Sequence, residues 1–140
     1  MKVILQNNSR IPIVHITIGN SQSLLLDCLI DTGFSGSLAG FVYSDKSGVK
    51  QFSIKNVDFI KPPVLLPEKN WTTLANGSKV ETWKAEVLCN LQNQYHETEI
   101  ILISVTKPQP IPLILGMSLL KAYKADLSIH FSSNIFSLNI

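Results

Sequence analysis

The stretch that decides the fold lies early in the chain and reads Leu24-Leu25-Leu26-Asp27-Cys28-Leu29-Ile30-Asp31-Thr32-Gly33-Phe34-Ser35-Gly36. Its first seven residues are almost continuously apolar, which predicts a β-strand buried on both faces. The remaining residues include two glycines among small polar side chains, which predicts a loop. The sequence therefore places Asp31 at the point where a buried strand turns into a tight loop.

Asp31 is a candidate catalytic carboxylate on physical grounds. A lone charge beside an apolar strand is costly unless it is paired or hydrogen-bonded. Next to it, Thr32 offers a hydroxyl and Gly33 lets backbone approach closely. A carboxylate in such a loop is a reasonable acid–base group, but an Asp-x-Gly loop is more often a turn in which the aspartate caps a backbone amide. The triplet by itself leaves both interpretations open.

Two further features follow downstream. Asn76-Gly77 separates the strand-like runs Trp71–Leu74 and Lys79–Leu91. This pair predicts a hairpin, because both residues tolerate the positive φ that a tight turn needs. Pro112–Leu120 then reads as a short apolar strand, a glycine and the start of a helix.

These features together resemble a known family. Leu29–Gly36 is similar to the active-site loop of the retropepsin-like aspartic proteases, a group of retroviral, cellular and prokaryotic enzymes. Pro112–Leu120 resembles the family's apolar strand, glycine and short helix, and Asn76-Gly77 lies where the family carries its flap. The ordered set is specific and covers most of the chain. The resemblance implies an all-β fold, a closed retropepsin-like barrel with one short C-terminal helix, which works as a homodimer.

The resemblance also implies roles for the matching residues. Asp31 would be the catalytic carboxylate, Thr32 would brace the two active-site loops against each other, and Gly33 would give close backbone approach to the substrate. Gly116 would have a structural role where the second apolar strand meets the loop. No metal or other cofactor is implied. The residues that would bind substrate, in the flap and the cleft, are Phe34, Ala75, Asn76, Gly77 and Ser78.

Three departures from the retroviral pattern concern the cleft and the flap. Phe34 stands where retroviral proteases usually have alanine, and Asp-Thr-Gly-Phe looks more like a prokaryotic branch of the family. The flap region has only Gly77 where retroviral flaps are richer in glycine. The segment Phe41–Lys69 is longer than its retroviral counterpart, and its prolines exclude a regular helix.

The rest of the chain is predicted from its pattern. Further strands are predicted where apolar and polar residues alternate or where apolar residues form a short run. Lys107–Pro112 must be an extended loop because it contains three prolines. Asn93-Gln94 predicts a turn, and Met117–Tyr123 is the best helix candidate. The terminal runs Val3–Leu5 and Ile135–Ile140 are expected to pair across a dimer interface. The predicted further strands are Ile11–Ile18, Tyr95–Val105, Leu113–Leu115, Asp126–Phe131 and Ile135–Ile140.

Length and composition limit the classes of function that the sequence allows. The 140 residues fit one domain, 1–140, with a net charge of +2 that is too small to argue for nucleic acid or an anionic membrane. Cys28 and Cys89 are widely separated; the sequence leaves a disulfide open but favours two buried free thiols, and the histidines complete no zinc pattern. The N-terminus turns polar too soon for a signal peptide, and no apolar run is long enough to span a membrane. We therefore expect a cytoplasmic protein.

The expected chemistry is metal-free general acid–base hydrolysis of a peptide bond in a peptide or protein substrate. Two Asp31 carboxylates, one from each subunit, would share a proton and activate water. The main alternative is a catalytically inactive dimeric module that uses the same cleft to bind an extended peptide. A structural domain with a coincidental motif is a third interpretation.

Overall fold

The structure of the chain, a computed structural model, describes residues 2–4, 12–130, 132–133 and 135–140. These residues form mostly strands, with one turn of 3-10 helix, η1 (Glu68–Asn70), and one α-helix, α1 (Met117–Ala122). The strands in chain order are β1 (Lys2–Ile4), β2 (Ile13–Ile18), β3 (Leu24–Ile30), β4 (Leu38–Ser44), β5 (Lys50–Phe52), β6 (Lys61–Leu65), β7 (Thr72–Thr73), β8 (Lys79–Val80), β9 (Thr82–Leu91), β10 (Gln94–Ser104), β11 (Leu113–Leu115), β12 (Asp126–His130) and β13 (Ile135–Asn139).

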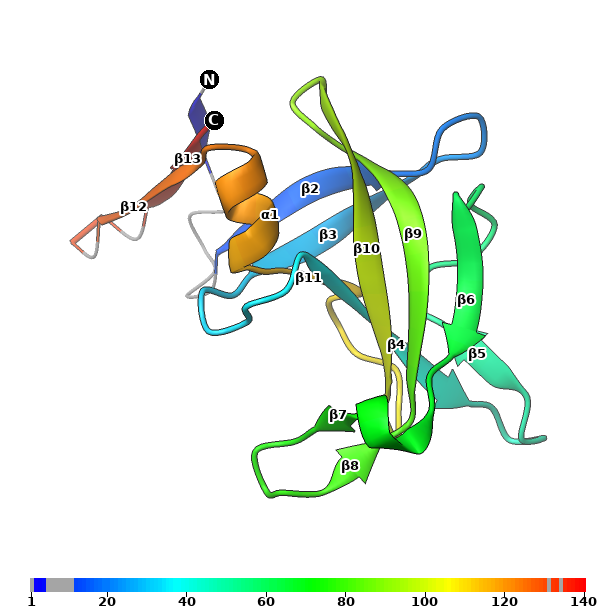
Figure 1. Ribbon diagram of the computed structural model, residues 1–140. Coiled ribbons are helices and arrows are strands. Elements are labelled where there is room, and N and C mark those ends of the chain that lie inside the picture. Colours follow the sequence, from blue (N-terminus) through cyan, green and yellow to red (C-terminus); the bar gives the residue numbers. More distant parts are fainter. Residues whose placement is uncertain (1, 5–11, 131, 134) are drawn as a thin grey trace.

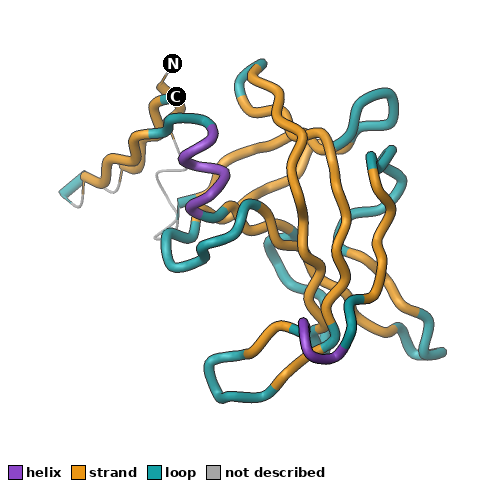
Figure 2. The backbone as a smooth tube through the Cα atoms, viewed as in Figure 1, coloured by secondary structure: helices purple, strands orange, loops and turns teal. Residues whose placement is uncertain are grey.

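Six of these strands close into a barrel (Figure 1; Figure 2). They follow one another in the order β9, β2, β3, β11, β4 and β10, and β10 pairs again with β9 to complete the ring. Most neighbours are antiparallel, whereas β11 runs parallel to β3 and β10 runs parallel to β4. Closure pairs strand edges that would otherwise be open, so the expected all-β closed barrel is confirmed.

Alternating side chains fill the barrel. On β2, Val14, Ile16 and Ile18 are buried, while His15 between them faces outward. The same period of two runs along β9 and β10, so each barrel strand contributes one face to a common core. The core residues of these two strands are Ala85, Val87, Cys89, Leu91, Ile100 and Leu102.

Burial on both faces, predicted for the whole of β3, is wrong for its first half. Leu24 and Leu25 are exposed, with 65% of Leu25 accessible. The reason is the length of the neighbouring strand: β11 pairs only with Cys28–Ile30, so the start of β3 has β2 as its single partner. Asp27 lies within β3, and its carboxylate is 2.8 Å from Nδ1 of His15.

The turn between β9 and β10 lies one residue earlier than predicted. Gln94 already pairs with Leu91, so the two loop residues are Gln92 and Asn93. Both have positive φ, 51° and 63°. This is the mirror-image turn that matches the twist of a two-residue hairpin, and Asn93 suits it because asparagine tolerates left-handed backbone.

A second sheet lies outside the barrel, beyond α1, and holds both ends of the described chain (Figure 1). Its order is β1, β13, β12, with antiparallel pairing throughout. The predicted terminal strands therefore form, but β1 and β13 pair within one chain. Leu5, Ile11 and Phe131, which the sequence also assigned to strands, lie outside the described residues.

The long segment between β4 and β7 adds short strands outside the barrel. β5 pairs with β4, and β6 pairs with β9. As predicted, no α-helix forms here: Pro62 and Pro63 lie in β6, where the register with β9 shifts. Tyr43 and Gln51 face each other in the β4–β5 pair, so the segment extends the barrel wall rather than forming a separate layer.

Asp58 fastens this segment to the turn between β2 and β3. Its carboxylate accepts hydrogen bonds from the backbone N–H of Asn20 (2.6 Å) and from Oγ and N–H of Ser21 (both 2.9 Å). These bonds stabilise the ionised form and lower the pKa of Asp58 to about 2. A side chain at Gly19, where φ is +100°, would collide with Gln22 and with this carboxylate.

The two cysteines are buried free thiols, as expected. Burial raises the pKa of Cys28 well above its ordinary value and that of Cys89 to about 12. Tyr123, at the end of α1, places its hydroxyl 3.3 Å from the Cys89 sulfur and donates to the carbonyl of Gln94. The described part of the chain has no helix of the length and hydropathy needed to cross a membrane.

Candidate active site

Asp31 immediately follows β3, and its own loop holds it in place. Its backbone N–H donates to the carbonyl of Leu115 at 3.0 Å, and its Oδ1 accepts the N–H of Gly33 at 2.9 Å. Asp31 therefore does cap a backbone amide, which was one of the two interpretations that the sequence left open. The Asp31 side chain is half-buried, and its Oδ2 has no hydrogen-bond partner among the described residues. One carboxylate oxygen is fixed, and the other is available to a ligand or water.

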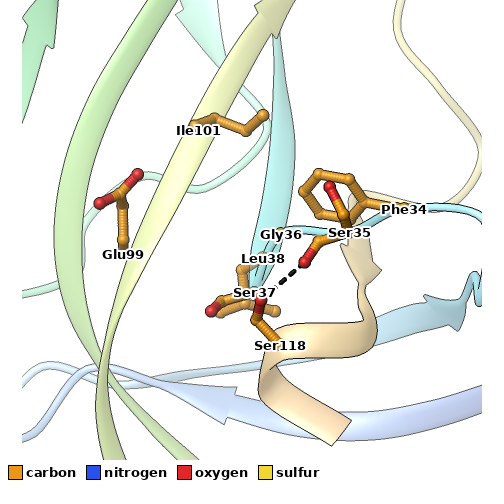
Figure 3. A pocket seen from close by; sticks show the side chains of 8 residues that line it. All are labelled: Phe34, Ser35, Gly36, Ser37, Leu38, Glu99, Ile101 and Ser118. Atoms are coloured by element: carbon orange, nitrogen blue, oxygen red, sulfur yellow. Dashed lines mark hydrogen bonds between the residues drawn. The ribbon is translucent and has the colours of Figure 1, made fainter. Parts of the chain in front are cut away.

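The Pro112–Leu120 motif packs directly against this loop. The N–H groups of Gly116, Met117 and Ser118 donate to the carbonyls of Ser37, Phe34 and Gly36. The Ser118 hydroxyl adds a bond of 2.6 Å to the carbonyl of Ser35, drawn in Figure 3. The loop after β3 is thus held along most of its length by the start of α1.

Gly116 lies where only glycine fits. A Cβ there would overlap the carbonyl oxygen of Gly36 and lie 2.7 Å from that of Phe34, and both contacts are with backbone. The two motifs that the sequence picked out separately are therefore in contact.

Phe34, assigned to the cleft by resemblance, packs against its own loop. A Cβ added to Gly36 would lie 2.5 Å from Cζ of the Phe34 ring, and one added to Gly116 would lie 2.6 Å from Cδ2. The half-buried ring covers both glycines and borders a hollow of about 330 Å³ (Figure 3). This hollow is lined by Phe34, Ser35, Gly36, Ser37, Leu38, Glu99, Ile101 and Ser118.

Thr32 is exposed and lies on a different face of the loop. It borders a hollow of about 500 Å³ between α1 and the start of β12. Met117 and Leu120 give this hollow an apolar wall, and Lys121, Lys124 and Asp126 give it a charged rim. The hydroxyl of Thr32 has no hydrogen-bond partner among the described residues, so it can bind a group from outside the chain.

The predicted hairpin is formed by β7 and β8, which join at residues 74–78. Leu74 N–H donates to the carbonyl of Ser78, and Gly77 N–H donates to the carbonyl of Leu74. Gly77 has φ of +86°, but the positive φ predicted for Asn76 is wrong. The loop has three residues instead of two, so only the last needs left-handed backbone. Asn76 instead accepts bonds from the N–H and hydroxyl of Ser78.

The hairpin projects from one end of the barrel, on the side where the loop after β3 also lies (Figure 1). Its tip, Ala75–Ser78, is exposed, and nothing lies within 4 Å of a Cβ placed on Gly77. Trp71 and Trp83 pack at its root: the Trp71 indole donates to the carbonyl of Leu66, and the Trp83 ring meets Phe52 edge-on at 6.0 Å.

An apolar hollow of about 190 Å³ was missed at the sequence level. Leu29 lies in β3, two residues before Asp31, and Ile114 pairs with it. In the sequence, the position of Leu29 near Asp31 and the proline-rich loop were the only signals of this hollow. The hollow forms only because β3 pairs with β11, a contact between distant segments that the sequence does not reveal. The hollow is lined by Leu29, Phe41, Gln109, Pro110, Ile111 and Ile114.

No group of three or more His, Cys, Asp or Glu side chains in the described ranges is arranged to hold a metal ion. Asp126 begins β12 and Asp27 pairs with His15, so neither lies in the loop with Asp31.

Comparisons with known proteins give a likeness of fold. EIAV protease, solved in complex with the inhibitor HBY-793, shares 18% sequence identity with this chain; the match covers 89% of this chain and 98% of that one, with a TM-score of 0.58. A Legionella pneumophila protein of unknown function (DUF785) shares 13% identity over 79% of this chain and 84% of its own, with a TM-score of 0.47. The retroviral protease-like domain of Ddi1 from Leishmania major shares 13% identity over 89% and 86%, with a TM-score of 0.45.

No family model matches the chain, and no curated protein matches it. The likeness to EIAV protease shows the fold: the barrel is retropepsin-like, as the sequence implied. The prokaryotic Asp-Thr-Gly-Phe subtype stays a prediction.

Proposed function

We propose that this chain is one half of a homodimeric aspartic endopeptidase, with Asp31 as its catalytic carboxylate. The observation that carries the proposal is the setting of Asp31 in a retropepsin-like barrel: it directly follows β3, is half-buried, and has one oxygen capped by Gly33. Its second oxygen has no partner among the described residues and can bind a water molecule.

The chemistry needs two carboxylates with different protonation states. Two such groups a few ångströms apart cannot both stay ionised, so they share one proton. The ionised Asp31 takes a proton from water, which attacks the peptide carbonyl carbon. The protonated Asp31 of the other copy hydrogen-bonds the developing oxyanion, and the leaving nitrogen is protonated as the carbon–nitrogen bond breaks.

The second carboxylate has to come from a second copy of the chain. Of the other four aspartates, Asp27 is paired with a histidine, and Asp45 and Asp58 cap backbone N–H groups of turns. Asp126 begins β12, outside the loop after β3. A twofold axis beside Asp31 supplies the missing group, because a residue that lies at the axis of an isologous interface is near its own copy.

Two surfaces support a dimer of this kind. The hollow beside Thr32 has an apolar wall of Met117 and Leu120 that a second copy can cover. The sheet of β1, β13 and β12 stands outside the barrel on the same side as α1 (Figure 1). We propose that partner residues fill the hollow and that Thr32 braces the two loops.

The proposed substrate is an extended peptide or protein segment with an apolar side chain near the scissile bond. The hollow formed by Leu29, Ile114 and the proline-rich loop lies beside the last residues of β3, which lead into Asp31, and has room for such a side chain. The β7–β8 hairpin would close over the peptide and exclude water. Two buried free thiols support a cytoplasmic location, because a reducing compartment keeps thiols free.

The alternative, a peptide-binding module without activity, is favoured by the amide cap on Asp31, an ordinary feature of turns. Asp31→Asn separates the two functions, because it keeps the shape and removes the ionisable group. We expect a folded dimer that binds peptides and cleaves none. Wild type should cleave members of a broad peptide library between acid and neutral pH; if it cleaves nothing, or if Asp31→Asn still cleaves, Asp31 is not a catalyst.

A further inference from the structure

Thr82 carries a buried hydroxyl at the root of the β7–β8 hairpin. It is the first residue of β9, and only 2% of it is exposed. Among the described residues, the one other polar or charged residue buried to this degree is Ser137. A hydroxyl is stable in such a place only when its hydrogen bonds are made, so its partners show what the residue holds.

All three partners of this hydroxyl belong to the two arms of the hairpin. Oγ1 of Thr82 accepts the N–H of Thr72 at 2.7 Å and donates to the carbonyl of Val80 at 3.0 Å. It also lies 2.8 Å from the hydroxyl of Thr72. One proton and two lone pairs satisfy all three contacts when the Thr72 hydroxyl is the donor in that pair. The proton and both lone pairs of the Thr82 hydroxyl therefore all have hydrogen-bond partners.

Thr72 and Val80 are paired residues of β7 and β8, so the Thr82 hydroxyl binds both arms of the hairpin at the same position along its length. The other hydrogen bonds of residues 72–80, within the described part of the chain, stay inside the hairpin. The segment that leads into the hairpin is held by the same residue, since Leu66 N–H donates to the carbonyl of Thr82 at 2.9 Å. The side chain and backbone of Thr82 thus fix the angle at which the hairpin leaves the barrel.

We propose that Thr82 is a positioning residue that sets the direction of the β7–β8 hairpin over the cleft through its hydroxyl. The effect on catalysis rests on the proposed function of the hairpin as a flap, whereas the effect on the hairpin itself does not. Without the hydroxyl, Thr72 N–H and the Val80 carbonyl lose their shared partner, and the hairpin leaves the barrel at a variable angle.

The test compares Thr82→Val, which removes the hydroxyl at nearly constant shape, with Thr82→Ser, which keeps it. Thr98→Val is the matched control, because its hydroxyl lies in β10 and makes one long bond of 3.4 Å to the carbonyl of Glu99. Hydrogen exchange at single amides is measured by NMR in the full chain. We expect at least tenfold faster exchange at Thr72 and Leu74 in Thr82→Val, with core amides such as Leu102 unchanged.

Peptide cleavage gives the second readout. We expect kcat/KM to fall at least tenfold in Thr82→Val, equal to about 1.4 kcal/mol, and mainly through KM because the hairpin then closes less often in the right place. Thr82→Ser should keep kcat/KM within about threefold of wild type, a change of about 0.65 kcal/mol, and Thr98→Val should match wild type.

Each outcome decides the proposal. Unchanged exchange at Thr72 and Leu74 in a folded Thr82→Val protein overturns it, as does an equal effect in Thr98→Val or a failure of Thr82→Ser to restore wild-type behaviour. If Thr82→Val does not fold, Thr72→Val carries the test, because it removes one of the three contacts and should give a smaller acceleration at Leu74. If wild type cleaves no peptide, the proposed function fails while the exchange result still decides the role of Thr82.

Discussion

The contact between the Phe34 ring and Gly36 makes a quantitative prediction about the loop after β3. A methyl group on Gly36 would lie 2.5 Å from Cζ and 2.8 Å from Cε1 of the ring, and no other group is closer than 3.4 Å. The φ of Gly36 lies outside the left-handed region, so alanine meets no backbone strain there. Gly36→Ala should therefore destabilise the protein through the ring alone.

The expected loss of stability in each variant follows from the packing of the Phe34 ring. Forcing an extra methyl group into a filled site costs about 1–3 kcal/mol, which for a chain of this length lowers the melting temperature by roughly 3–10 °C. Phe34→Ala costs about 2 kcal/mol, roughly half the value for a fully buried ring. In the Phe34→Ala background, Gly36→Ala should cost nothing, and can add about 0.4–1 kcal/mol of stability by restricting the unfolded chain.

The assay is urea unfolding of the four proteins in this double-mutant cycle. We expect a coupling energy of at least about 1 kcal/mol between positions 34 and 36. Gly116→Ala is the control, because its added methyl group also meets backbone carbonyl oxygens that Phe34→Ala leaves in place. If the effects at 34 and 36 add within about 0.5 kcal/mol, the ring does not lie over Gly36 and the packing described for the loop is wrong.

Three further predictions test the hairpin, the turn clamp and the apolar hollow. Gly77→Val places a β-branched residue at φ of +86°, which costs about 1–2 kcal/mol and strains only the hairpin tip. Peptide cleavage should fall at least tenfold, while the melting temperature of the barrel stays within a few degrees of wild type. Unchanged cleavage kinetics would rule out a flap. Because the pKa of Asp58 is about 2 in the folded chain, below its unfolded value, its stabilisation is complete above about pH 4 and is lost as pH falls toward 2. Asp58→Asn should therefore unfold at a lower temperature than wild type at pH 6, with the deficit shrinking between pH 4 and 2, and a deficit as large at pH 2 as at pH 6 would contradict the clamp. Ile111→Trp should fill part of the 190 Å³ hollow and slow cleavage of peptides with large apolar side chains near the scissile bond about tenfold more than that of peptides with alanine there; an equal effect on both would place the substrate elsewhere.

Those parts of the fold that depend on neighbours in sequence could be predicted. Val14, Ile16 and Ile18 alternate with polar residues and form β2 as expected, and Met117–Ala122 is helical. Asn76-Gly77 marked a hairpin because turn chemistry is local, although it could not show whether the loop has two or three residues. The closed barrel was implied by the resemblance to a known family and not by any local pattern in the sequence.

The parts that could not be predicted depend on which strands become neighbours. The exposure of Leu25 follows from the shortness of β11, which lies some 90 residues away in sequence. The hollow at Leu29 and Ile114 and the buried hydroxyl of Thr82 arise in the same way, from contacts between distant segments. Phe34 carried a signal, its size beside two glycines, but only the structure shows that the ring folds back over Gly36.

The prolines of β6 have a consequence for how copies of this chain behave in a crowded solution. β6 ends the strand order of the barrel sheet, and Val64 and Leu65 expose apolar side chains along it. A flat apolar strand in this place would invite another chain to add to it and grow into a fibre. Pro62 and Pro63 offer no N–H to an incoming strand and interrupt the register, so the exposed side of the sheet is a poor template for aggregation.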